Sequence, residues 1–182
     1  NANLAIKAIE GIAAYGDLAK MAGKNDIAQK YTAKAKEMAA AWKQMAEQGD
    51  HYRLTFNEGD TWSQKYNLVW DILFDFNLFP KELYVAESEK YREELNAFGV
   101  PLDYRRDFTK TDWMLWAACL DETNENTEKF SGRIVAYLND TKDRNCFSDW
   151  VETKEPKQCG FDHRTVQAGL WMPVLKKKLL NK

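Results

Sequence analysis

The sequence has few of the residues that bind metals or form disulfides. Its histidines are His51 and His163, and its cysteines are Cys119, Cys146 and Cys159. None of them has the short spacing of zinc ligands, so we expect no metal site. A disulfide between Cys146 and Cys159 would leave one thiol over, and the odd count gives it little support. Phosphate loops, dinucleotide fingerprints and nucleophile elbows are also absent, so no cofactor is expected.

Long apolar runs are missing as well. No stretch approaches the about 18 consecutive apolar residues of a transmembrane helix, and no signal peptide precedes the first helical pattern. The formal net charge is only −2, so neither nucleic acid nor a membrane is an expected partner. The chain opens Asn1-Ala2-Asn3-Leu4 without a methionine, which favours a processed or excised piece of a longer protein.

Helical periodicity is what the sequence does have. Apolar residues recur at spacings of three and four, the period of one helix face. The patterns predict seven helices at about 2–22, 26–48, 63–76, 81–98, 112–121, 125–138 and 164–180. Gly23 is suited to end the first helix, and Asp26 with Gln29 resembles a capping box for the second. Pro173 should kink the last helix, and residues 51–56 alternate like a short strand.

The connections between these helices alternate in length. Long loops at 49–62, 99–111 and 139–162 separate helix pairs that are joined by only a few residues. Because the helices of a hairpin run antiparallel, the three long loops should lie at the same end. Helices with few charges alternate with charged ones, which predicts an inner and an outer layer. We therefore expect one all-α domain, residues 1–182, built as part of an (α/α)6 toroid.

Each long loop places carboxylates beside aromatic residues just before an inner helix. Hydrolysis of an amide or glycosidic bond needs a proton donor and a base or nucleophile on opposite sides of the scissile atom. Helix N-termini favour ionised carboxylates, whereas aromatic walls raise carboxyl pKa values, so the loops can supply both groups. The candidate catalytic residues are Asp103, Asp112 and Asp149. The candidate substrate-binding residues are Trp62, Asp71, Arg105, Arg106, Trp113, Trp150 and Glu152.

These residues also have structural interpretations. Ser63 and Thr111 have the positions of helix N-caps, and Asp60 that of a turn residue. The two arginines are natural partners of nearby acids. Asp71 lies within a helix that is otherwise apolar, so it is either a satisfied member of the core or a ligand-binding group.

Five ordered motifs give the sequence a family resemblance. They are residues 62–71 (WSQKYNLVWD), 78–80 (LFP), 99–103 (GVPLD), 109–113 (TKTDW) and 147–150 (FSDW). Over almost the whole chain the sequence resembles the glutaminase A family of bacteria and fungi. The resemblance implies a secreted or periplasmic enzyme that hydrolyses L-glutamine to L-glutamate and ammonia. It also implies that this chain is the last part of a six-hairpin toroid, with further domains upstream in the parent chain.

In this interpretation one acid activates water against the side-chain amide and another protonates the departing ammonia. Arg105 or Arg106 would bind the substrate carboxylate. A glycoside hydrolase or sugar-binding toroid is the first alternative, because fold alone does not decide function. A non-catalytic helical interaction domain is the second.

The first helix carries apolar residues around much of its circumference: Leu4, Ile6, Ile9, Ile12 and Leu18. A toroid buries such a helix only when hairpins flank it on both sides. We therefore expect an exposed apolar patch on the isolated chain. The chain alone should form a homodimer, bind another chain or be marginally stable, and it should lack glutaminase activity.

Overall fold

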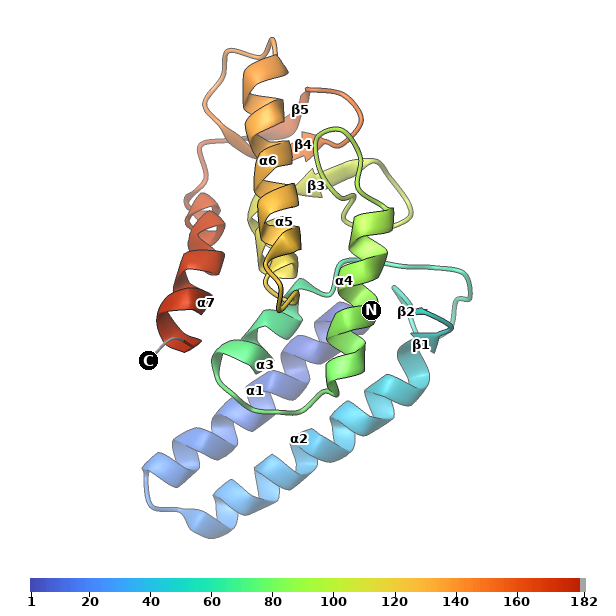
Figure 1. Ribbon diagram of the computed structural model, residues 1–182. Helices are drawn as coiled ribbons and strands as arrows, with labels where there is room; N and C mark the ends of the chain where they lie inside the picture. Colours follow the sequence, from blue (N-terminus) through green and yellow to red (C-terminus); the bar gives the residue numbers. More distant parts are fainter. Residues whose placement is uncertain (181–182) are drawn as a thin grey trace.

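The computed structural model describes residues 1–180, which form seven α-helices and two small β-sheets (Figure 1). The helices are α1 (Ala2–Met21), α2 (Asn25–Ala46), α3 (Val69–Leu73), α4 (Lys81–Glu93), α5 (Thr111–Ala118), α6 (Glu125–Asp140) and α7 (Met172–Leu180). Two 3₁₀ helices, η1 (Tyr66–Leu68) and η2 (Thr165–Trp171), precede α3 and α7. A mostly helical chain is thus confirmed, whereas the two sheets depart from the predicted all-α class.

Both sheets lie in segments between the predicted helices or at their ends. Strands β1 (Glu47–Gln48) and β2 (His51–Tyr52) form an antiparallel hairpin at the end of α2. Strands β3 (Phe108–Lys110), β4 (Ser148–Glu152) and β5 (Gln158–Asp162) form an antiparallel sheet in that order. Strands of two to five residues are too short to show a clear alternation of apolar and polar residues, so the sequence pattern did not reveal the larger sheet.

The three long loops meet at one end of the helical hairpins, as predicted, and we call this region the loop end. Strand β3 belongs to the second long loop and pairs with β4 of the third. The end of the first loop joins the second through the backbone: Tyr104 donates to Trp62 at 3.2 Å, and Gln64, just after the first loop, donates to Leu102 at 2.9 Å. Figure 1 shows the three-stranded sheet beside one end of α5 and α6. Backbone pairing therefore fixes loops that are distant in sequence against one another.

A buried ion pair fixes the first long loop to α4. The side chains of Lys65 and Glu87 are 0% and 1% exposed, and Nζ lies 3.7 Å from Oε2. Lys65 Nζ also donates to the backbone oxygens of Tyr52 and Ser63, both at 2.8 Å. Glu87 accepts from the backbone N–H of Tyr52 and from the Tyr91 hydroxyl. Because both charges have further hydrogen-bond partners, the pair can define the position of the loop without an unsatisfied charge in the core.

Helix α1 packs along α2 through a face that includes Ile6 and Ile9, which are buried. Gly16 lies so close to α2 that a Cβ there would be 2.9 Å from the Thr32 hydroxyl oxygen. Elsewhere on α1 large apolar side chains are exposed, and we call them the α1 stripe: Leu4, Tyr15, Leu18 and Met21. Tyr15 lies at its edge and packs against Tyr31 of α2, with ring centroids 4.7 Å apart. The expected exposed apolar surface on α1 is therefore present, although Ile6 and Ile9 are not part of it.

Several predicted helix boundaries are wrong. The third helix is reduced to η1 and α3, and Ser63 is not an N-cap but forms an isolated bridge with Asp103. Lys24 caps α2 and Lys110 caps α5, both without a side-chain hydrogen bond, so neither the capping box nor the Thr111 cap exists.

The last helix also differs from the prediction. Helix α7 begins at Met172, which places Pro173 in its first turn, where the missing N–H costs no hydrogen bond and no kink is needed. Met172 is also the single buried residue of α7, so this helix is not the buried inner helix that the alternation of layers predicted. None of the helices within residues 1–180 has the length and apolar character needed to cross a bilayer.

Candidate functional site

Asp149 is the centre of the most highly charged cluster at the loop end. Its side chain is 0% exposed and receives two cations, Lys110 from the end of β3 and Arg164 from the residue before η2. Lys110 Nζ lies 3.2 Å from Oδ2, and Arg164 binds both carboxylate oxygens, with Nε 3.0 Å from Oδ1. Burial alone would raise the pKa of Asp149, but the Arg164 hydrogen bond and the Lys110 charge outweigh it and lower that pKa. Asp149 is therefore held in its ionised form.

Asp112, the second candidate acid, has the opposite character. It lies in the first turn of α5, is 3% exposed, and its Oδ1 has no hydrogen-bond partner within residues 1–180. Burial raises the pKa of Asp112 to about 6, the nearby charge of Asp149 adds to the shift, and a hydrogen bond from the Trp113 backbone opposes it. One acid stays ionised while the other changes protonation state near neutral pH, which is the arrangement that separates acid and base roles.

Aromatic rings enclose the cations of this cluster. Lys110 Nζ lies 4.5 Å from the ring centroids of both Trp150 and Phe161, and the Arg164 guanidinium lies 4.2 Å from that of Phe161. Trp150 packs edge-on against Phe108 of β3, with ring centroids 5.4 Å apart. Cations held against aromatic faces are stabilised by the ring quadrupole. We call Asp112, Asp149, Lys110 and Arg164 the charged cluster.

Asp103 lies in the second long loop, and its partner is the neighbouring Arg105. Arg105 Nη2 is 2.7 Å from Asp103 Oδ2, and its Nε and backbone N–H bind Oδ1. The Arg105 side chain is 60% exposed, whereas that of Asp103 is 8% exposed, so Arg105 covers a buried acid from the surface. Arg106 lies over the Phe108 ring, at 5.4 Å from its centroid. The structural interpretation of Arg105 as the partner of a nearby acid is confirmed.

Asp71 lies in α3, away from the charged cluster, and its carboxylate has hydrogen-bond partners. It accepts from the backbone N–H groups of Leu78 at 3.0 Å and Phe79 at 3.4 Å, and from the Tyr84 hydroxyl. The side chain is 3% exposed, and burial with these donors fits the satisfied-core interpretation. Its neighbour Glu10 was not singled out from the sequence, although it too is buried and neither of its carboxyl oxygens has a hydrogen-bond partner within residues 1–180.

The remaining candidate binding residues are dispersed. Trp62 is part of the main core, and Trp113 stacks on Tyr66 with ring centroids 4.4 Å apart. Glu152, at the end of β4, accepts a weak hydrogen bond from Cys159 Sγ at 3.4 Å. Trp150 is the candidate binding residue of this group whose ring lies against a cation of the charged cluster.

The backbone of η2 covers Asp112. A Cβ placed on Gly169 would lie 2.9 Å from Asp112 Cβ and 2.8 Å from Trp116 Nε1. The indole N–H of Trp116 donates to the Gly169 carbonyl at 3.2 Å, which holds η2 in place. No residue of η2 is buried, so it lies across the candidate acid as an outer strap of backbone.

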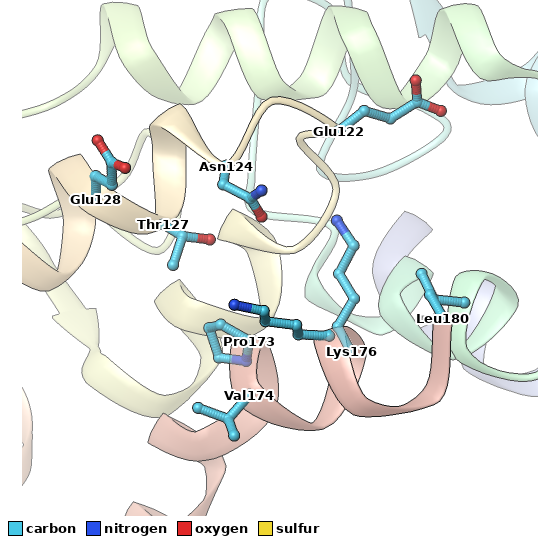
Figure 2. A pocket seen from close by; sticks show the side chains of 9 residues that line it. Glu122, Asn124, Thr127, Glu128, Pro173, Val174, Lys176 and Leu180 are labelled. Atoms are coloured by element: carbon cyan, nitrogen blue, oxygen red, sulfur yellow. The ribbon is translucent and has the colours of Figure 1, made fainter. Parts of the chain in front are cut away.

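Two cavities formed by the described residues lie away from the charged cluster. One of about 750 Å³ opens between α7 and the start of α6, and Figure 2 shows Pro173, Val174 and Leu180 facing it from α7. A second, of about 280 Å³, lies between α4 and the turn before α6. Trp62, Asp103, Asp112 and Asp149 line neither of these cavities, so the expected common concavity is not seen there. Among residues 1–180 no group of three or more His, Cys, Asp or Glu side chains is arranged for a metal, and all three cysteines are free.

The sequence pattern missed the two cations of the charged cluster. Lys110 is part of the motif at residues 109–113, directly before Asp112, and that position was the available signal. Arg164 follows β5 and reaches Asp149 across the hairpin, with no local pattern to identify it.

The fold consists of antiparallel helical hairpins, and two buried acids, Asp112 and Asp149, lie close together where the long loops meet. These features define a helical-hairpin protein with a candidate site built from carboxylates. The chain belongs to the glutaminase A six helical-hairpin domain family, whose family model matches residues 1–174. It is 29% identical over 174 residues to "Glutaminase A" of Aspergillus oryzae, an alignment that covers 92% of this chain and 25% of that protein. It is 22% identical over 182 residues to a protein of Arthroderma benhamiae named as a probable glutaminase, covering 84% of this chain and 21% of the relative. The chain thus spans about a quarter of the length of these relatives, and no solved structure matches it significantly.

Changing Asp149 to asparagine is expected to destabilise the chain by about 3–5 kcal/mol, because Lys110 and Arg164 lose the buried anion to which both bind. Removing an acid from a helix terminus would cost much less stability, but Asp149 lies in strand β4 and not at a helix terminus. The control is Asp107→Asn, which breaks an exposed ion pair to Lys154 (2.9 Å) and should cost at most about 1 kcal/mol. Urea unfolding of both variants measures the difference. Equal losses would show that the charged cluster contributes no more than a surface ion pair.

Proposed function

We propose that this chain is the helical part of an amidohydrolase that converts L-glutamine and water to L-glutamate and ammonia. Membership of the family and the names of its relatives support the substrate. The observation that carries the chemistry is the pair Asp112 and Asp149, two buried neighbouring acids with pKa values shifted in opposite directions. We further propose that the hairpins form an arc of an (α/α)6 toroid with its active site at the loop end.

Asp112 is the proton-transfer group in this proposal. A base works best when its pKa lies near the working pH, and the pKa of about 6 leaves Asp112 mostly ionised at neutral pH. It takes a proton from the attacking water and returns that proton to the amide nitrogen as ammonia leaves. Asp149 stays deprotonated throughout the reaction and holds Lys110 and Arg164 beside the reacting groups. Asp103 is the weaker catalytic candidate, because Arg105 already binds both of its oxygens.

Access to Asp112 requires a change in the strap. The acid is 3% exposed beneath η2, so substrate reaches it only when the backbone around Gly169 moves away. The strap is held by a small number of polar contacts, among them Trp116 to Gly169 and Gln167 to Phe147. An outer segment without buried residues is the kind of element that opens at low cost.

The surroundings of the chain are part of the proposal. Upstream domains of the same parent chain would complete the toroid, and the parent would be secreted or periplasmic. The exposed α1 stripe supports an additional helical partner, because monomers rarely leave several large apolar side chains of one helix uncovered. On its own the chain would instead pair with a second copy or be marginally stable, and it would be inactive.

A sugar is the competing substrate. Phe108, Trp150 and Phe161 place three aromatic rings beside the charged cluster, and carboxylates beside such platforms also suit glycoside hydrolysis. The fold does not separate the two chemistries.

Product analysis of the full-length protein with L-glutamine and with a panel of oligosaccharides tests the proposal. Release of ammonia and glutamate is expected, with no new reducing ends. The 182-residue chain alone, assayed in parallel and sized by light scattering, should release no ammonia and should dimerise or unfold readily. Sugar hydrolysis without glutaminase activity would refute the proposed function, and an active stable monomer would refute the partial toroid.

A further inference from the structure

The charged cluster is neutral when both of its acids are ionised and carries an excess positive charge when Asp112 is protonated. Lys110 and Arg164 both bind Asp149, so two cations share one ionised acid. Asp112 is the other acid whose charge acts on both cations. It contributes a full negative charge only after it loses its proton, which the proposed reaction requires it to regain in each cycle. Whenever Asp112 carries the proton, the excess positive charge of the cluster suits a ligand with a negative charge of its own.

Arg164 is the member of the cluster with hydrogen-bond donors to spare. Its Nε and Nη2 bind Asp149, whereas Nη1 has no hydrogen-bond partner within residues 1–180. Its side chain is 38% exposed, in contrast to the fully buried Asp149. The Phe161 ring lies against the guanidinium and fixes its plane. A planar guanidinium held in one orientation is the group that recognises a carboxylate through two parallel hydrogen bonds.

We propose that Arg164 determines substrate specificity by binding the carboxylate of an amino acid through the guanidinium edge that Asp149 leaves open. The proposal rests on the proposed glutaminase function and specifies which residue selects an anionic substrate over a neutral one. It replaces Arg105 and Arg106 in that role. Arg105 is bound by Asp103 on both oxygens, and Arg106 lies against the opposite end of the sheet from Asp149.

The position of Arg164 connects recognition to the strap. Arg164 directly precedes η2, and its carbonyl oxygen accepts a hydrogen bond from Gln167 in the strap at 3.3 Å. A carboxylate bound by Arg164 therefore lies next to the segment that covers Asp112. Only four residues separate Arg164 from Gly169, the residue of the strap that lies over Asp112.

The test compares Arg164→Gln with wild type in the full-length enzyme on two substrates, L-glutamine and L-glutamine methyl ester, in which the carboxylate is masked. Loss of a charge-assisted pair should raise KM for L-glutamine about 10- to 100-fold and change kcat much less. KM for the ester should be the same in both proteins. Arg164→Lys keeps a positive charge beside Asp149 but lacks the fork, and its KM should be intermediate. Arg133→Gln, on the exposed surface of α6, is the matched control and should leave both KM values unchanged.

The outcomes separate specificity from a structural role. A loss of stability alone would affect both substrates equally, and that result would overturn the inference, as would a larger effect of Arg105→Gln or Arg106→Gln. If the wild-type enzyme does not hydrolyse glutamine, calorimetric binding of L-glutamate and of its dimethyl ester replaces the kinetics. Arg164-dependent binding of L-glutamate alone would then support the carboxylate site while the proposed glutaminase function fails. Binding of a neutral sugar with no L-glutamate binding would overturn both.

Discussion

Asp112→Asn should reduce turnover of the full-length enzyme by about 10²–10⁴-fold without lowering its melting temperature. The loss in rate follows because asparagine cannot carry the proton between water and the leaving nitrogen. The free energy of unfolding should not fall, because burying the ionised carboxylate destabilises the folded chain. Its pKa rises to about 6 on folding, so the folded chain gives up stability as pH increases from the unfolded value of 3.8 through 6. Asparagine has no charge to bury.

The same pKa predicts the pH profile of the reaction. Asp112 must be ionised to accept a proton, so kcat/KM should rise with pH through about 6 and level off above it. Asp17→Asn, on the exposed face of α1, is the control for loss of a carboxylate and should retain full activity. Calorimetric melting and steady-state kinetics of the two variants test both the expected loss of turnover and the expected unchanged stability. An active Asp112→Asn enzyme, or one with lost activity only in proportion to lost stability, would assign Asp112 a structural role.

Glu10→Gln should stabilise the chain in a strongly pH-dependent way. Burial, with a further contribution from the charge of Asp71, raises the pKa of Glu10 to about 9. Between pH 4.5 and 9 the folded chain therefore keeps a proton that the unfolded chain releases, and stability declines by about 1.4 kcal/mol per pH unit. At pH 7 the resulting cost is about 3 kcal/mol. Glutamine has the same shape and does not titrate, so it avoids this cost.

The free energies of unfolding of wild type and Glu10→Gln should converge at pH 4.5 and separate steadily toward pH 9. Urea unfolding at three or four pH values measures the separation, and the shared titration of all other groups cancels in the difference. Glu128→Gln, an exposed acid of α6, should show no such trend. A constant difference between Glu10→Gln and wild type would mean that Glu10 is ionised in the folded chain and that a counter-charge stabilises it.

The helical hairpins could be predicted from sequence because their signals are local. Apolar spacing locates α2, α4 and α6 to within a few residues at most ends, and alternating loop lengths place the long loops together. Helix α1 shows where this reasoning fails. It carries apolar residues around much of its circumference, and the structure buries Ile6 and Ile9 while Leu4 and Leu18 stay exposed. Periodicity identifies a helix with two apolar faces but cannot say which neighbour covers each face.

The acidic residues of the site could be predicted from the sequence, but the pKa shifts of these residues could not. Asp112 and Asp149 stand out because each adjoins a tryptophan within a motif. The lowered pKa of Asp149 depends on Arg164 and Lys110, which meet it only after β3, β4 and the turn before η2 come together. The raised pKa of Asp112 depends on burial in the folded chain. Ser63 and Thr111 were expected to be caps because caps have a local pattern, yet tertiary pairing places Ser63 beside Asp103. Interactions between distant segments leave no trace in local spacing.

Glycine at position 169 has a consequence for the evolution and engineering of this site. Its backbone needs no unusual dihedral angle, and the constraint comes only from the space above Asp112 and Trp116. Any larger residue would act as a wedge between the strap and α5, and would admit water to Asp112 without altering a polar atom of the charged cluster. The size of one uncharged side chain thus sets how far the acid is separated from solvent.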